Sequence, residues 1–185
     1  MNHYLDISIL PDPEFPATVL LNSLYSKLHK ALHDLTSTKI GVSFPDYNVT
    51  LGNVLRIHGE ESALHELQRL DWIGGMRSYC EISSITPVPT GAKFRTVSRK
   101  QTTMSSAKLR RLIKRGSITE DKIKQYKANM LCQALNYPYI ELVSSSNGHK
   151  HRRYIEFGEL LDEPVKGDFD LFGLSKTATV PWFNA

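Results

Sequence analysis

The sequence predicts an α+β protein, in which a ferredoxin-like βαββαβ domain at residues 1–89 precedes an α+β domain at residues 90–185 with an arginine-rich helix. Two observations lead to this prediction. Strand-like and helix-like patterns alternate in that order over the first half of the chain. After Pro87 and Pro89 the composition changes, and a run of eight residues from Lys108 holds five basic and three aliphatic side chains.

The first half of the chain follows a regular alternation of periodicities. Leu5, Ile7 and Ile9 fall on one face of a strand expected from Tyr4 to Leu10. A proline-rich break follows, and leucines then recur at helical spacing from about residue 17 to residue 35. The other elements expected here are a strand at 40–44, a strand at 54–58, a short helix at 60–69 and a strand at 79–88. Their order is βαββαβ.

The second half mixes helices and strands. The patterns predict a strand at 93–99, the arginine-rich helix at 106–115, a helix at 119–135, strands at 139–146 and 149–157, and further strands at 169–173 and 179–183. Asn147-Gly148 is a strong hairpin signal because both residues tolerate positive φ. A two-residue turn there would place Ser144 opposite His151 and Ser146 opposite His149, on one face.

Charge and cysteine content narrow the class of protein. Net charge is only +4, but no acidic residue occurs between Glu81 and Glu120, so the basic character is local and predicts a binding surface. Cys80 and Cys132 match no metal-ligand spacing and fit reduced thiols in a cytoplasmic protein. Met1 leads directly into strand-like sequence, and the apolar runs are too short for a bilayer, so we expect neither a signal peptide nor membrane insertion.

The arginine-rich helix has two contrasting faces. Three aliphatic residues, Leu109, Leu112 and Ile113, fall on one narrow face and would hold the helix to the protein. The opposite side presents Lys108, Arg110, Arg111, Lys114 and Arg115. Such a row of cations suits the phosphates of a nucleic acid, because binding releases condensed counterions. The alternative is a solvated basic face without a partner.

Two groups of residues could carry chemistry. His29 lies at the border of the apolar stripe of its helix, where an imidazole can transfer protons near neutral pH; the alternative is a half-buried structural histidine. No histidine has metal-like spacing beside a third ligand. The hairpin tip would gather hydroxyls and imidazoles without a carboxylate. This disfavours an acyl-transfer triad and suits hydrogen bonds to phosphate or ribose, unless the tip is merely polar.

Several short segments resemble one known family, in the same order and with nearly the same spacing. They are His3-Tyr4-Leu5-Asp6-Ile7, Pro11-Asp12-Pro13-Glu14-Phe15-Pro16, Lys27-Leu28-His29, Ile40-Gly41-Val42-Ser43-Phe44-Pro45, Val97-Ser98-Arg99, Gly173-Leu174-Ser175-Lys176 and Val180-Pro181-Trp182-Phe183. Together with the arginine-rich helix, they resemble the CRISPR RNA-processing endoribonucleases of type I-F systems, almost from end to end.

This resemblance implies an activity and its residues. The arginine-rich helix would enter the major groove of a repeat-RNA hairpin, and Arg99 and Gln101 would read base edges near the bottom of the stem. A ribose 2′-hydroxyl would attack the scissile phosphate without metal or other cofactor. His29 would be the general base, and Ser144 would hold the attacking nucleotide, with Ser146 as an auxiliary phosphate contact. Partners would be the repeat-RNA stem-loop and other subunits of a type I-F complex, in the cytoplasm.

Two positions depart from the family pattern. Phe172 stands where the family has a tyrosine that braces the histidine; a phenyl ring can pack against His29 but cannot donate a hydrogen bond. His151 stands at an often aromatic position, where it could stack under the terminal base pair. An RNA-binding subunit without cleavage is therefore the second hypothesis. A DNA-binding regulator is the third hypothesis, although nothing in the sequence indicates a dimer that binds paired DNA half-sites.

Overall fold

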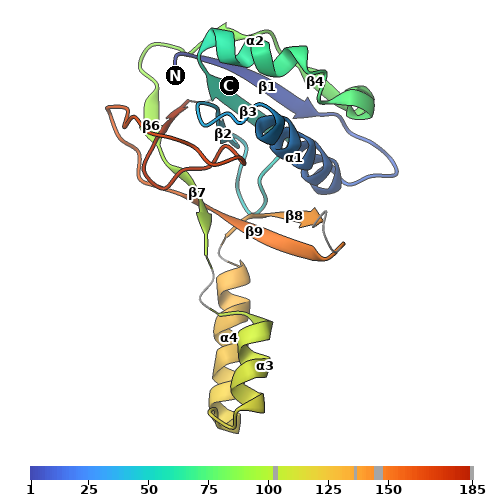
Figure 1. Ribbon diagram of the computed structural model, residues 1–185, viewed down its shortest axis with the longest axis vertical. Helices are drawn as coiled ribbons and strands as arrows, with labels where there is room; N and C mark the ends of the chain where they lie inside the picture. The colour runs from blue at the N-terminus through green and yellow to red at the C-terminus, as the bar shows by residue number, and fades with distance from the viewer. Residues whose placement is uncertain (102–103, 136, 144–147, 184–185) are drawn as a thin grey trace.

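The computed structural model describes residues 1–101, 104–135, 137–143 and 148–183, and shows a mixed α+β protein (Figure 1). Every strand pairing in these residues is antiparallel. The four expected helices are confirmed to within one residue at each end. None of the described helices is long and apolar enough to cross a membrane.

The first half of the chain builds one sheet with helices packed on it. Its elements are β1 (His3–Ile9), α1 (Ala17–Asp34), β2 (Gly41–Ser43), β3 (Val54–Gly59), α2 (Glu61–Arg69), a 3₁₀ turn η1 (Gly74–Tyr79), β4 (Cys80–Ile82) and β5 (Thr86–Pro87). The strands lie in the order β2-β3-β1-β4, and β5 also pairs with β1. Hydrophobic alternation in β1 turns Leu5, Ile7 and Ile9 into the core, as expected.

The strand expected at 79–88 is divided into two. Ile82 pairs with Ile7 and Thr86 with Tyr4, so one extra residue lies between these pairs on the later strand. The hydroxyl of Ser83 accepts a hydrogen bond from the Asp6 amide at 2.9 Å and so satisfies a donor of the ladder. The break is therefore a bulge.

The helix α1 carries the residue that matters most for the site. Its leucines at 20, 21, 24, 28 and 32 are all buried, and this stripe fixes the helix against the sheet. His29, next to the stripe, is only partly buried. The expected position of His29 at the border of the apolar face is confirmed.

The second half forms two further sheets and a helical hairpin. β6 (Lys93–Arg95) pairs with β10 (Val180–Trp182), and β9 (Lys150–Phe157) lies between β7 (Val97–Lys100) and β8 (Tyr139–Val143). The helices α3 (Ser106–Lys114) and α4 (Glu120–Leu135) run side by side and project away from the sheets (Figure 1). The Ser105 side chain caps α3 at the Lys108 amide, and Gly116, with φ +63°, follows its end.

The predicted register of the hairpin between β8 and β9 is wrong. His151 pairs with Leu142 and Lys150 with Val143, whereas the expected register would pair His151 with Ser144. The two registers differ by two residues, so Ile140 and Leu142, which pack against α1, would lie on the buried face in either one. The expected contacts of Ser144 and Ser146 lie outside the described residues.

The expected strand at 169–173 is also wrong, because these residues form a tight turn. One carboxylate oxygen of Asp170 accepts hydrogen bonds from the amides of Phe172 and Leu174, both at 2.9 Å. Gly173 adopts a φ of +71°, which suits glycine. These side-chain hydrogen bonds satisfy donors that a strand would pair with a neighbour.

The same turn connects the two halves of the molecule. The carbonyl of Gly173 accepts from the amide of Val42 in β2 at 3.0 Å, and the Ser175 amide donates to the carbonyl of Val97 in β7 at 2.9 Å. Residues 170–175, called the Asp170 turn below, therefore hold the first sheet and the β7-β9-β8 sheet beside each other.

Candidate functional site

His29 is anchored to the Asp170 turn by its ring nitrogen. The Nδ1 atom lies 2.8 Å from the carbonyl oxygen of Leu171. A carbonyl oxygen can only accept, so Nδ1 carries the proton in this contact. In the neutral ring, the lone pair is then on Nε2, and this atom can take up a proton.

Tyr25 lies one turn before His29 on α1 and binds the next carbonyl of the same turn. Its hydroxyl donates to the carbonyl oxygen of Phe172 at 2.8 Å. Burial, reinforced by the negative charge of Asp170, raises the pKa of the Tyr25 phenol, so the group remains a donor. Residues at i and i+4 of one helix thus fasten two consecutive carbonyls.

The ring of Phe172 lies between an imidazole and a guanidinium. The His29 ring stacks on it with centroids 3.5 Å apart and planes 12° from parallel. The guanidinium carbon of Arg153 lies 3.5 Å from the same ring centroid. Two groups cannot occupy one face at that distance, so Arg153 and His29 cover opposite faces of Phe172. The expectation that Phe172 packs against His29 is confirmed.

Arg153 is buried on β9 with few polar contacts. Only 8% of its surface is exposed, and its nearest carboxylate oxygen, on Asp170, is 3.8 Å from Nη1. Its Nε atom has no hydrogen-bond partner among the described residues. Burial, together with the charge of Arg99, lowers the pKa of the Arg153 guanidinium.

A cleft of about 430 Å³ adjoins this stack. It is lined by Arg99, Gln101, Arg153, Asp168, Phe169, Asp170, Leu174, Ser175 and Lys176. Two of the residues predicted to bind RNA, Arg99 and Gln101, therefore lie beside the Asp170 turn. Arg153 connects the cleft to the Phe172 ring and, through it, to His29.

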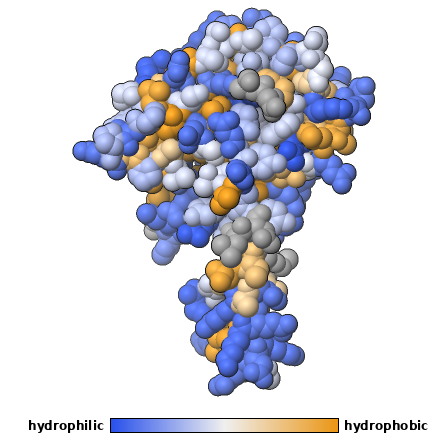
Figure 2. Space-filling model, turned by 180° about the vertical axis from the view of Figure 1, so that it is seen from behind, coloured by the Kyte–Doolittle hydropathy of each residue, from blue (hydrophilic) through white to orange (hydrophobic). Residues whose placement is uncertain are grey.

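The basic residues of α3 lie on the projecting hairpin, apart from this cleft. Lys108, Arg110, Arg111, Lys114 and Arg115 are all exposed, as expected. Figure 2 shows that the lower part of the hairpin is mostly hydrophilic. The buried aliphatic face of α3 is narrower than the sequence predicted. Leu109 is buried, whereas Ile113 is 48% exposed. The reason is that α3 leans on α4 rather than on a sheet, with its start fixed by the Tyr126 hydroxyl at the Ser105 amide.

Sequence reasoning missed Arg153 and Asp170. Arg153 falls in a basic segment at residues 150–153, which suggests a solvated surface. The two-residue period of the strand offered a signal, because Arg153 and the apolar Ile155 must share a face. Which face is buried depends on how β9 packs against the rest of the chain.

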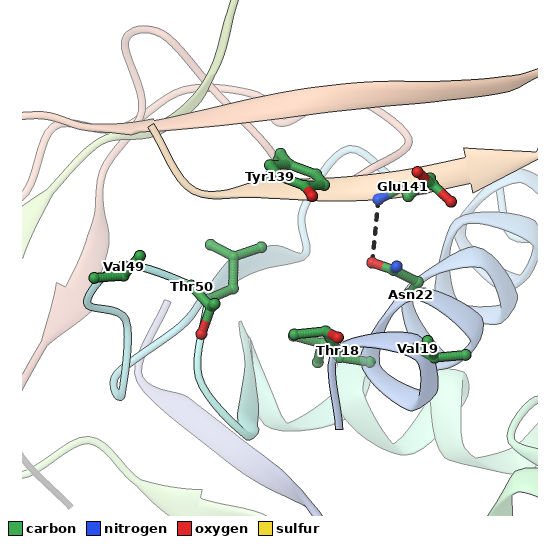
Figure 3. A pocket seen from close by; sticks show the side chains of 9 residues that line it. Thr18, Val19, Asn22, Val49, Thr50, Tyr139 and Glu141 are labelled. Carbon is green, nitrogen blue, oxygen red and sulfur yellow. Dashed lines mark hydrogen bonds between the residues drawn. The ribbon is translucent and has the colours of Figure 1, made fainter. Parts of the chain in front are cut away.

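A second hollow lies at the start of α1 (Figure 3). It measures about 250 Å³ and is lined by Thr18, Val19, Leu21, Asn22, Val49, Thr50, Leu51, Tyr139 and Glu141. The side-chain oxygen of Asn22 accepts from the Glu141 amide at 3.1 Å and so ties α1 to β8. The Glu141 carboxylate lies within 4 Å of Lys150 and Arg152. These contacts indicate a structural junction.

The buried His58 has a structural role. His58 lies in the core, with Nε2 2.7 Å from the Ser43 hydroxyl. Burial lowers the pKa of the His58 imidazole well below its usual range, and the charge of Arg56 adds to this shift. Among the residues that the structure describes, no group of three or more histidine, cysteine or acidic side chains could hold a metal ion.

A family model and two relatives match this chain over almost its whole length. The family model described as "CRISPR-associated protein (Cas_Csy4)" matches residues 4–183. The "CRISPR-associated endonuclease Cas6/Csy4" of Escherichia coli (strain UTI89 / UPEC) is 43% identical over 184 residues, which is 99% of this chain and 100% of that protein. The protein of the same description from Pseudomonas aeruginosa (strain UCBPP-PA14) is 38% identical over 187 residues, with 99% and 100% covered.

A solved structure described as "Structure A of CRISPR endoribonuclease Cse3 bound to 19 nt RNA" aligns with a TM-score of 0.41 and 13% identity. The alignment covers 98% of this chain and 100% of that chain.

Proposed function

Because this chain belongs to the Cas_Csy4 family of CRISPR-associated proteins, we propose that it is an endoribonuclease that cleaves CRISPR repeat RNA at the base of a hairpin. The product is mature guide RNA, and the protein stays bound to the product stem-loop. The observation that carries this proposal is the hydrogen bond from His29 Nδ1 to the Leu171 carbonyl, which leaves Nε2 of this partly buried imidazole as a proton acceptor.

The reaction uses the RNA's own nucleophile. Nε2 of His29 takes the proton of the ribose 2′-hydroxyl upstream of the scissile phosphate. The resulting oxygen attacks phosphorus, the bond to the 5′-oxygen of the next nucleotide breaks, and that oxygen leaves as a hydroxyl after gaining a proton. The upstream product carries a 2′,3′-cyclic phosphate or, after hydrolysis, a 3′ phosphate. Ser144, which lies outside the described residues, would hold the attacking nucleotide.

The two basic regions bind different parts of the RNA. The exposed cations of α3 contact the phosphates of the stem and fix the position of the hairpin on the protein. Arg99 and Gln101 lie at the cleft and read base edges near the bottom of the stem, with the usual pairings of arginine to guanine and glutamine to adenine. His151, exposed on β9, would stack under the terminal base pair, and Ser146 would contact phosphate.

The first half supports an assignment as a ferredoxin-like domain. Its elements follow the order βαββαβ, and its antiparallel sheet has the strand order β2-β3-β1-β4. The arginine-rich helix, residues 106–115, belongs to the second domain, residues 90–185. Other subunits of a type I-F complex would bind the protein after cleavage.

The proposal is tested by incubating the protein with its cognate repeat RNA in EDTA. Cleavage at the stem base, lost when the 2′-hydroxyl at the cleavage site is replaced by hydrogen, is the expected result. Loss of activity in EDTA that magnesium restores would contradict a metal-independent reaction. Tight binding without cleavage would favour the second function, a non-cleaving RNA-hairpin subunit. The phenyl ring at position 172, which lacks a hydroxyl, supports that alternative.

A further inference from the structure

We propose that Arg153 is a positioning residue of the cleavage site, which sets the plane of the His29 ring by clamping the opposite face of Phe172. The proposal rests on the proposed function, because the orientation of His29 matters for the rate only if His29 is the base. Phe172 has no polar atom in its side chain. It can therefore orient the imidazole only through the position of its own ring.

The polar contacts of Arg153 do not compensate for the burial of its charge. A buried guanidinium normally requires a close carboxylate and several hydrogen-bond acceptors. Here Asp170 is 3.8 Å away, beyond hydrogen-bond distance, and Nε has no partner among the described residues. The closest compensation is the π face of Phe172, 3.5 Å from the guanidinium carbon.

The clamp acts on a ring that is already held at its backbone. The Phe172 carbonyl accepts from the Tyr25 hydroxyl, and its amide donates to Asp170. These bonds fix the main chain, but they leave the ring free to turn about its side-chain torsions. With Arg153 on one face and His29 on the other, the ring has one orientation. That orientation keeps the imidazole plane 12° from parallel to it.

The titratable groups around Arg153 come from three elements. Arg99 on β7 faces it from the neighbouring strand, Asp170 from the Asp170 turn, and the buried Tyr25 phenol from α1. Arg99 and Arg153 lie on the same face of the sheet, since Arg99 pairs with Ile155, two residues from Arg153. Repulsion from Arg99 disfavours movement of the guanidinium toward the cleft, and this helps to keep it on the ring.

The test compares Arg153→Leu with Arg152→Leu. Leucine at 153 retains an apolar contact with Phe172 and removes the cation. Arg152 is adjacent on β9 but points to the other face, where it is about half exposed and lies over the Tyr139 ring at 4.4 Å. We expect the single-turnover cleavage rate at saturating RNA to fall about tenfold for Arg153→Leu and to stay unchanged for Arg152→Leu. Affinity of Arg153→Leu for a 2′-deoxy, uncleavable RNA should stay within about twofold of wild type.

A second readout does not depend on cleavage. The stacked phenyl ring shifts the imidazole proton resonances of His29, so Arg153→Leu should move these NMR signals and Arg152→Leu should not. Arg153→Lys retains a cation over the ring and should recover part of the lost rate. A lysine variant no faster than the leucine variant would count against the clamp.

The outcomes separate the two proposals. If the wild-type protein does not cleave its repeat RNA, the proposed function fails, and the His29 signals still decide whether Arg153 orients the ring. If the wild type cleaves and Arg153→Leu cleaves equally fast with unmoved His29 signals, only the positioning role is overturned. A large loss of RNA affinity at an unchanged saturated rate would instead show that Arg153 contacts RNA directly.

Discussion

The Nδ1 atom of His29 donates a hydrogen bond to the carbonyl oxygen of Leu171, a residue 142 positions later in the chain. Through this contact, α1, which packs on the first sheet, and the Asp170 turn near the C-terminus form parts of one site. It also determines which ring nitrogen can act as a base.

His29→Ala should abolish measurable cleavage while hairpin affinity changes by no more than a few-fold. A general base contributes about 10²–10⁴-fold in rate and little to binding. The single-turnover rate and the dissociation constant for a 2′-deoxy repeat hairpin check both parts. His33→Ala is the matched control, because His33 is one turn later on α1 and exposed. An active His29→Ala protein would show that another group takes the proton.

Phe172→Tyr should change the single-turnover rate by less than a few-fold, whereas Phe172→Leu should slow it. The imidazole is already held by the Leu171 carbonyl and by stacking, so an added hydroxyl has little left to supply. A net hydrogen bond is worth about 1 kcal/mol, which corresponds to several-fold in rate. A rise of that size in Phe172→Tyr would mean that His29 is poorly oriented in the natural sequence.

Replacement of both Arg111 and Arg115 by alanine should weaken RNA binding far more than it changes the cleavage rate of bound RNA. Each phosphate contact that is lost should flatten the slope of log affinity against log salt by about one unit or slightly less. Arg69→Ala, an exposed arginine on α2, serves as control. An unaltered salt slope in the double variant would exclude α3 as the docking surface.

Tyr25→Phe should lower the free energy of unfolding by about 1–3 kcal/mol, because the Phe172 carbonyl loses its donor in a buried place. Urea unfolding followed by circular dichroism measures this change. Cleavage should slow as well, since the Asp170 turn carries both Leu171 and Phe172. Tyr126→Phe, on the projecting hairpin, should leave the cleavage rate at saturating RNA unchanged.

The buried His58 should make the protein less stable as the pH falls. Its folded pKa lies well below 6.5, so below about pH 6.5 the unfolded chain binds a proton that the folded chain does not. The contribution to the slope is at most about 1.4 kcal/mol per pH unit. His58→Gln removes the titrating group and can still bond to Ser43, so its stability should fall less between pH 6.5 and 5. Equal slopes in the two proteins would contradict the lowered pKa.

Local pattern was enough to determine much of this protein. The four helices, the βαββαβ order of the first half, the stripe of leucines on α1, the border position of His29 and the exposed cations of α3 all follow from periodicity and capping signals within a few turns of chain. The segments that resemble the type I-F family also pointed to His29, and the Cas_Csy4 match over residues 4–183 is consistent with that resemblance.

Only the tertiary structure decided how distant residues meet. The pairing of Leu142 with His151 differs by two residues from the register that Asn147-Gly148 predicts, and a shift of two keeps the same side chains on the buried face, so the hydrophobic pattern cannot distinguish the two registers. The turn at 169–173 and the burial of Arg153 depend on contacts between α1, β9 and the C-terminal segment. Sequence alone specifies that Arg153 and Ile155 share a face of a strand; the packing of the whole chain determines that this face is buried against Phe172.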